Sequence, residues 1–107
     1  MNAETLLSGK RVLLIDNSYL TQKAMGMIFK RKKILAFFSP TAKDALEKLE
    51  TQVIDAVLLD IQLQGVIGID FCKTIRSLYP NLPIIIITAL TSADILVNTF
   101  SAGADDF

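Results

Sequence analysis

Four short apolar runs constrain this chain more than any other feature of its sequence. They occupy residues 12–15 (VLLI), 34–38 (ILAFF), 56–59 (AVLL) and 83–87 (PIIII). None of the runs shows the polar alternation of a half-buried strand, and each is too short for a buried helix. Segments with apolar residues at helical spacing follow the runs. This order of strand and helix, repeated four times, predicts an open, doubly wound α/β sandwich of three layers around a parallel sheet.

The intervening segments carry the expected helix signals. Pro40 and Ser92 stand where helices begin, Lys30 to Lys33 form a basic helix end, and Pro80 and Gly103 stand where helices end. A loop is expected at residues 65–68. The apolar positions, helix by helix, are Leu20, Ala24, Met27 and Ile28; Ala42, Ala45, Leu46 and Leu49; Phe71, Cys72, Ile75 and Leu78; and Leu96, Val97 and Phe100.

Length and charge narrow the class of protein. A chain of 107 residues can bury one core, so we expect a single domain. Eleven basic and eleven acidic residues cancel, which disfavours direct binding to nucleic acid or to an anionic membrane. One cysteine and no histidine leave no set for zinc or for an internal disulfide. Without a signal peptide or a membrane-spanning run, the expected compartment is the cytoplasm.

Polar side chains follow three of the predicted strands. Asp16 and Asn17 come after the first strand, Asp60 after the third with Gln62 close behind, and Thr88 after the fourth. A lone aspartate at a strand end is usually a turn or cap residue. In doubly wound sheets, however, ligands bind at the carboxyl ends of the strands, so we expect these residues to converge.

Two carboxylates and an amide form an oxygen-rich site of the kind that holds Mg(II). The metal would offset the repulsion between Asp16 and Asp60 and stabilise the spread charge of a phosphoryl group. Asp60 can then act as the nucleophile and form an acyl phosphate. Cys72 lies on the apolar face of a predicted helix, so we expect it to belong to the core.

Five motifs in this order resemble the receiver domain of two-component response regulators. They are LLIDN at residues 13–17, VLLD at 57–60, Gly68 eight residues after Asp60, ITA at 87–89 and AGADDF at 102–107. The resemblance covers about residues 10 to 107 and implies the CheY-like or flavodoxin-like fold. Residues 1–107 would then be one receiver domain, with residues 1–9 as a lead-in.

The resemblance also implies a function for the chain. Asp60 would accept a phosphoryl group from a histidine kinase or a phosphotransfer protein. Asp16, Asn17 and Asp60, with the backbone carbonyl of Gln62, would hold Mg(II). Any catalysis would be at most Mg-dependent self-phosphorylation from a phosphodonor and self-dephosphorylation.

The output of such a domain is a change of surface. Thr88 would bind a phosphoryl oxygen, and Ala89 would leave room for it. Phe107 stands at the family's switch aromatic, which turns inward when the threonine moves. A downstream effector protein or domain would recognise the switched surface.

The sequence departs from the family pattern at three places, one of which, the loop at residues 64–67, should leave the chemistry unaffected. Asn17 stands where the family usually has a second acid, so we expect weaker Mg(II) binding. The sequence ends at Phe107, three residues before the family's lysine, and before the fifth strand and helix. We therefore expect either a truncated domain or self-association through the open edge of residues 84–87.

Two alternatives remain open at this level. A pseudoreceiver would keep the fold and bind proteins without phosphorylation, which Asn17 and the absent lysine favour. An aspartyl-phosphate hydrolase of the haloacid dehalogenase type would also place its nucleophile after a buried strand. That family has a second acid two residues after the first, and Gln62 is not one.

Overall fold

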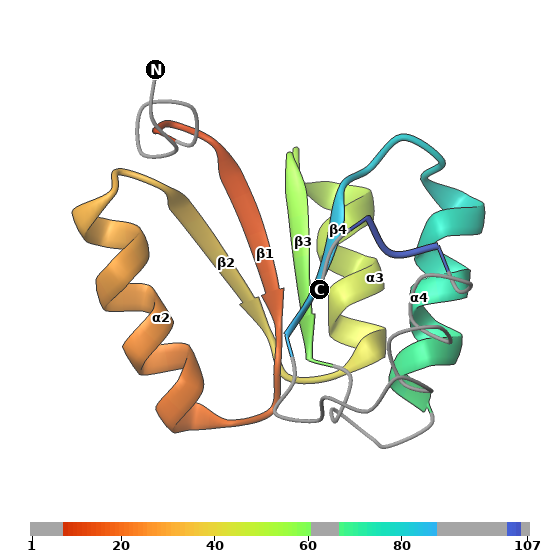
Figure 1. Ribbon diagram of the computed structural model, residues 1–107, viewed down its shortest axis with the longest axis horizontal. Coiled ribbons are helices and arrows are strands. Elements are labelled where there is room, and N and C mark those ends of the chain that lie inside the picture. The colour runs from red at the N-terminus through yellow and green to blue at the C-terminus, as the bar shows by residue number, and fades with distance from the viewer. Residues whose placement is uncertain (1–7, 61–66, 88–102, 106–107) are drawn as a thin grey trace.

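A computed structural model describes residues 8–60, 67–87 and 103–105 of the chain, and strands and helices alternate along it (Figure 1). The elements are β1 (Arg11–Ile15), α2 (Tyr19–Arg31), β2 (Leu35–Ser39), α3 (Ala42–Thr51), β3 (Ala56–Asp60), α4 (Ile67–Leu78) and β4 (Ile84–Ile87). The four strands match the four apolar runs of the sequence to within one residue at each end. No helix in these described ranges is long and apolar enough to cross a membrane.

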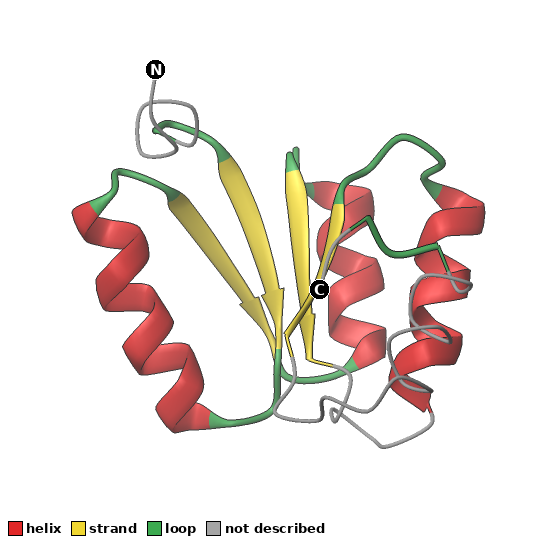
Figure 2. Ribbon diagram, viewed as in Figure 1, coloured by secondary structure: helices red, strands yellow, loops and turns green. Residues whose placement is uncertain are grey.

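The four strands form one parallel sheet in the order β2-β1-β3-β4 (Figure 2). From β1 the chain moves to β2 on one side and later returns to β3 on the other, so the direction of winding reverses between β1 and β3. That reversal is the topological switch point of a doubly wound fold. The predicted fold class is confirmed.

Helices cover both faces of the sheet. Helix α2 lies on one face, and α3 and α4 lie together on the other (Figure 1). The larger core is on the α3 and α4 face, where Cys72 is buried as predicted. Its buried members are Leu13, Ile15, Ala45, Leu49, Val57, Leu59, Phe71, Cys72, Ile75, Ile84, Ile86 and Ala104.

The smaller core explains why the strands differ in burial. It holds Val12, Phe29 and Ile34 as buried members on the α2 face. Strand β1 lies inside the sheet and is buried on both faces from its second residue, whereas β3 and β4 alternate between buried and half-buried residues. The expectation of strands buried on both faces therefore holds for β1 and only in part for β3 and β4.

The inward face of α2 differs from the predicted one. Leu20 is 77% exposed and Met27 is 63% exposed, whereas Phe29 is 6% exposed. At 3.6 residues per turn, Phe29 and Met25 lie about half a turn away from the stripe of Leu20 and Met27. Helical spacing detects an apolar stripe, but α2 carries two, and the larger aromatic side chain faces the sheet.

Three predicted boundaries also change. Helix α3 begins at Ala42, and its cap is Thr41, whose Oγ1 accepts a hydrogen bond from the backbone N–H of Asp44 at 3.1 Å. Strand β2 extends to Ser39, one residue beyond the predicted run. Helix α4 already includes Gly68, which the sequence had placed in a loop.

The fourth predicted helix, with Ser92, Leu96, Val97 and Phe100, lies outside the described residues.

Two aspartates fasten the amino ends of the strands in the same way. The carboxylate of Asp55 accepts a hydrogen bond from the N–H of Arg11 at 2.7 Å, and the N–H of Asp55 donates to the carbonyl of Arg11 at 2.7 Å. Asp105 makes the same pair of bonds with Ile84, each at 2.8 Å. Segments far apart in sequence are thereby held at the start of β1 and the start of β4.

Arg76 connects this edge to α4. Its guanidinium donates to the carbonyls of Gly103, Pro80 and Leu82 at 2.8 Å each and to the carboxylate of Asp105 at 2.6 Å. Gly103 has a φ of +104°, and a Cβ there would lie 2.7 Å from Cγ of Arg76. Glycine at this position therefore permits both the backbone conformation and the close approach of Arg76.

Candidate site at the carboxyl ends of the strands

Asp16 and Asp60 meet at the switch point of the sheet. The last residues that pair between β1 and β3 are Ile15 and Leu59; Asp16 directly follows β1, and Asp60 is the last residue of β3. Neighbouring strands lie about 4.8 Å apart, so the two backbones approach each other closely at this edge. The register brings the backbones of Asp16 and Asp60 next to each other, and the convergence of all the predicted site residues stays a prediction.

Asp16 is a buried carboxylate on a fixed loop. It is 3% exposed, and its backbone N–H donates to the carbonyl of Ser39 at 3.0 Å. Its Oδ1 accepts from the backbone N–H of Ser18 at 2.7 Å, and its carbonyl accepts from Nε2 of Gln22 at 2.6 Å. Strand pairing, a local turn and the first turns of α2 therefore all hold Asp16 in place.

Ser18 joins this loop to α2. Its side-chain oxygen accepts a hydrogen bond from the N–H of Thr21 at 3.2 Å, which makes Ser18 the cap of the helix. Asn17 lies between the buried Asp16 and the cap, and its side chain is exposed. Neither Ser18 nor Gln22 was identified as a site residue from the sequence, although a serine two residues after an aspartate and just before a helix is a typical cap signal.

Asp60 is half-buried at the end of β3, where its backbone pairs with Ile87 of β4. The register thus brings the last described residue of β4 beside Asp60. The other predicted site residues, Gln62, Thr88, Ala89 and Phe107, lie outside the described residues. Their roles stay predictions.

The donor chemistry of this edge suits a hard divalent cation. Carboxylate oxygens from Asp16 and Asp60 and an amide oxygen from Asn17 are the ligand types that Mg²⁺ and Ca²⁺ prefer, and no sulfur or imidazole group belongs to the set. The described residues contain no group of three or more acidic, histidine or cysteine side chains that could enclose a metal. Mg²⁺ is commonly bound through one or two carboxylates and keeps several water ligands.

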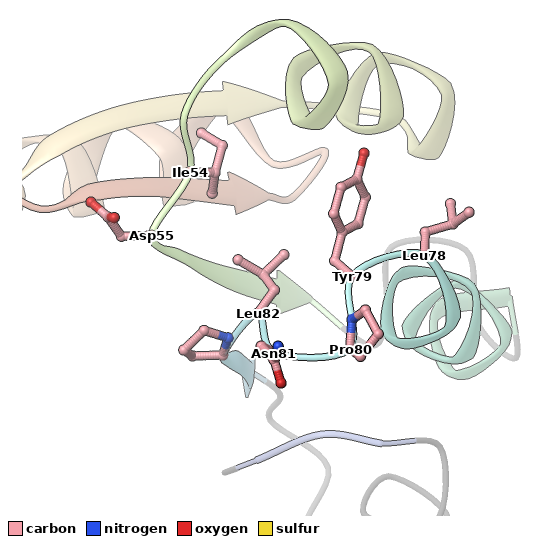
Figure 3. Close-up of a pocket in the computed structure, with 8 residues that line it drawn as sticks. Ile54, Asp55, Leu78, Tyr79, Pro80, Asn81 and Leu82 are labelled. Atoms are coloured by element: carbon pink, nitrogen blue, oxygen red, sulfur yellow. The ribbon is translucent and has the colours of Figure 1, made fainter.

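A separate pocket lies at the opposite edge of the sheet (Figure 3). Its volume is about 420 Å³, and it opens between the segment before β3 and the loop from α4 to β4. Its lining is mostly apolar and consists of Ile54, Asp55, Leu78, Tyr79, Pro80, Asn81, Leu82 and Pro83. Asp55 is at the amino end of β3 and Asp60 at its carboxyl end, so this pocket is distinct from the carboxylate site.

Residues 12–107 match the family model of the response regulator receiver domain. The matched range contains all the predicted site residues. The chain belongs to the response regulator receiver family. It is thus a receiver domain of two-component signalling, as the motifs indicated.

Individual relatives agree with this assignment. The receiver domain is 30% identical over 97 residues to the cell cycle transcriptional regulator CtrA of Caulobacter vibrioides, covering 91% of this chain and 42% of that protein. The chain thus spans well under half the length of that relative. A response regulator receiver protein from Pseudomonas putida is 27% identical, with a TM-score of 0.83 over 92% of this chain and 83% of that one.

A third protein has a similar fold and a described ligand state. It is a response regulator from Burkholderia pseudomallei whose crystal structure holds a phosphorylated aspartic acid, a calcium ion and citrate. It is 20% identical to the receiver domain, with a TM-score of 0.82 over 91% of this chain and 57% of that one. At that identity the likeness concerns the fold.

Proposed function

We propose that this receiver domain accepts a phosphoryl group on Asp60 from a histidine kinase or a phosphotransfer protein. The observation that carries the proposal is the register of β1 and β3, which puts Asp60 beside the buried Asp16 at the switch point. A carboxylate oxygen of Asp60 forms the new bond to phosphorus. The bond from phosphorus to the donor's imidazole nitrogen breaks, and its electron pair leaves with the imidazole.

In this proposal Asp16, Asn17, Asp60 and the backbone carbonyl of Gln62 hold Mg(II). The bound metal supplies positive charge that offsets the charge of the two carboxylates and of the phosphoryl oxygens. Support comes from the all-oxygen donor set and, more distantly, from the calcium ion described in the Burkholderia protein. Asn17 brings no charge, so Mg(II) affinity is lower than with two acids at residues 16 and 17.

The remaining predicted residues complete the switch. Thr88 is the next residue after Ile87, which ends β4 and pairs with Asp60. Thr88 therefore binds a phosphoryl oxygen in this proposal, and Ala89 leaves room for the phosphoryl group. Phe107 changes its position in response, and a downstream effector protein or domain recognises the altered surface. These roles rest on the order of the motifs in a confirmed member of the family.

The test is incubation with acetyl phosphate and Mg²⁺ followed by measurement of intact mass. Wild-type protein is expected to gain one phosphoryl group, and Asp60→Asn to gain none. Asp55→Asn is the matched control because Asp55 precedes the same strand at its other end. An adduct on Asp60→Asn would remove Asp60 from the proposed role.

A pseudoreceiver is the second candidate, and Asn17 is the observation that favours it. Such a protein would bind its partner through the receiver fold without accepting phosphate. It would show no adduct with any small phosphodonor, and Asp60→Ala would leave partner binding unchanged. The phosphoaccepting proposal predicts the opposite for both measurements.

A further inference from the structure

Gln22 makes a contact that neither the motifs nor the proposed reaction uses. It is half-buried in the first turns of α2, and its backbone N–H donates to the carbonyl of Ser18 at 3.0 Å. Its side-chain Nε2 reaches back and donates to the carbonyl of Asp16 at 2.6 Å. The side chain therefore connects the helix to the backbone of the loop that carries Asp16 and Asn17.

The carbonyl that Gln22 holds belongs to the peptide unit between Asp16 and Asn17. Because a peptide unit is planar, fixing the direction of its carbonyl also fixes the plane in which the Asn17 nitrogen and Cα lie. The bond from the Ser18 N–H to Oδ1 of Asp16, at 2.7 Å, constrains the other side of Asn17. Asn17 is exposed, yet two hydrogen bonds define the backbone on either side of it.

We propose that Gln22 is a positioning residue for the divalent cation. By holding the peptide between Asp16 and Asn17, it fixes the backbone from which the Asn17 side chain reaches the proposed cation site. The inference rests on the proposed metal site. Asn17 has no charge to attract the cation, so its contribution depends on being in place before the metal arrives.

A purely structural role for Gln22 would have a different signature. If the hydrogen bond only stabilised the start of α2, its loss would lower the free energy of unfolding and leave Mg²⁺ affinity unchanged at temperatures where the protein is folded. A positioning role requires a change in Mg²⁺ affinity. Groups that orient metal ligands typically affect affinity by about 10- to 100-fold.

The experiment compares two glutamines at opposite ends of the sheet. Gln22→Met keeps the size of the side chain and removes the donor to Asp16. Gln52→Met is the matched control, because the Gln52 amide also makes one side-chain hydrogen bond, accepting from Arg11 at 3.2 Å at the amino edge. Calorimetric titration with Mg²⁺ alone is expected to show about tenfold weaker binding for Gln22→Met and no change for Gln52→Met.

A second readout needs no metal. The amide signal of Asn17 in nuclear magnetic resonance spectra of the metal-free protein should shift in Gln22→Met and stay in place in Gln52→Met. If Gln22→Met does not fold, Gln22→Asn provides the same test, since it keeps the amide but is one methylene too short to reach Asp16.

Each outcome decides between the proposals. Equal Mg²⁺ affinity in wild type and Gln22→Met would overturn the positioning role, whatever happens to stability. A wild-type protein that binds no Mg²⁺ would overturn the metal site and this inference together. Mg²⁺ binding that depends on Gln22, in a protein that gains no phosphoryl adduct, would support the inference while the phosphoaccepting proposal fails.

Discussion

The residues of this candidate site differ in how clearly the sequence alone identifies them. Asp16 and Asp60 stand out because each follows an apolar run and both fall at the carboxyl edge of the predicted sheet. Gln22 does not stand out, since a polar residue in the first turns of a helix is ordinary. Its role depends on a hydrogen bond to a backbone carbonyl six residues earlier, which only the folded chain brings within reach.

Asp105 is a second residue whose importance appears only in the fold. In the sequence it is one of two aspartates that follow Gly103, and no pattern there indicates its contacts. In the structure its carboxylate accepts from the N–H of Ile84 at 2.8 Å and from Arg76 at 2.6 Å. The hydrogen bond from Ile84, followed by the Arg76 guanidinium, lowers the pKa of Asp105 below its ordinary value of 3.8.

This lowered pKa predicts a pH-dependent contribution to stability. The folded state favours the charged form of Asp105, so its stabilisation is present above about pH 3.8 and is lost as pH falls through the lower folded pKa. Asp105→Asn should therefore lower the melting temperature near neutral pH and have less effect in acid. The loss should stay below about 1 kcal/mol because the side chain is largely exposed.

Thermal unfolding of both proteins across a pH series measures this difference. A gap between wild type and Asp105→Asn that is the same at every pH would show that the charge of Asp105 contributes nothing to stability.

Among the elements, α2 shows best where sequence patterns stop being informative. The stripe of Leu20, Ala24, Met27 and Ile28 has good helical spacing, and α2 does form. The stripe nevertheless faces away from the sheet, because Met25 and Phe29 make the contacts with the core. Periodicity determines that a helix is amphipathic, whereas packing decides which apolar residues are buried when the helix has two candidate faces.

Mutations on the two faces of α2 should change the free energy of unfolding by different amounts. Phe29→Ala should destabilise the fold by about 3 to 5 kcal/mol, because it empties a buried aromatic site. Leu20→Glu and Met27→Glu should each change the free energy of unfolding by no more than about 0.5 kcal/mol, because both side chains are mostly exposed. Urea unfolding of the three variants measures these values. A large loss of stability in Leu20→Glu would show that the face predicted from the sequence is the buried one.

At the scale of the whole molecule, the sheet order decides where chemistry can occur. Any arrangement of four parallel strands would gather strand ends at one edge, and Asp16 and Asp60 are neighbours there because the order β2-β1-β3-β4 sets β1 beside β3. Strand β4 lies at one side of the described sheet, and among the residues that the structure describes only Asp105 pairs with its outer edge. A hydrophobic edge strand is a template for pairing with another chain.

Self-association through β4 stays one of the two open predictions, beside a truncated domain, and it can be measured. Light scattering coupled to size-exclusion chromatography should show an average mass that rises with protein concentration. Placing a lysine in the strand, as in Ile85→Lys, should reduce that rise, since charge on an edge strand opposes further pairing. A mass that stays monomeric at every concentration would exclude association by this edge.

The sequence by itself determined the fold class and the positions of the four described strands, and it showed that Asp16 and Asp60 fall at the ends of two of them. It could do so because buried strands need unbroken apolar runs, and parallel strands carry their carboxyl ends to one edge. Only the tertiary structure decided the burial of Phe29, the contacts of Asp105 with Arg76 and Ile84, and the hydrogen bond from Gln22 to the carbonyl of Asp16. These contacts join residues that no periodic pattern in the sequence relates to each other. They form only when the folded chain brings those residues together.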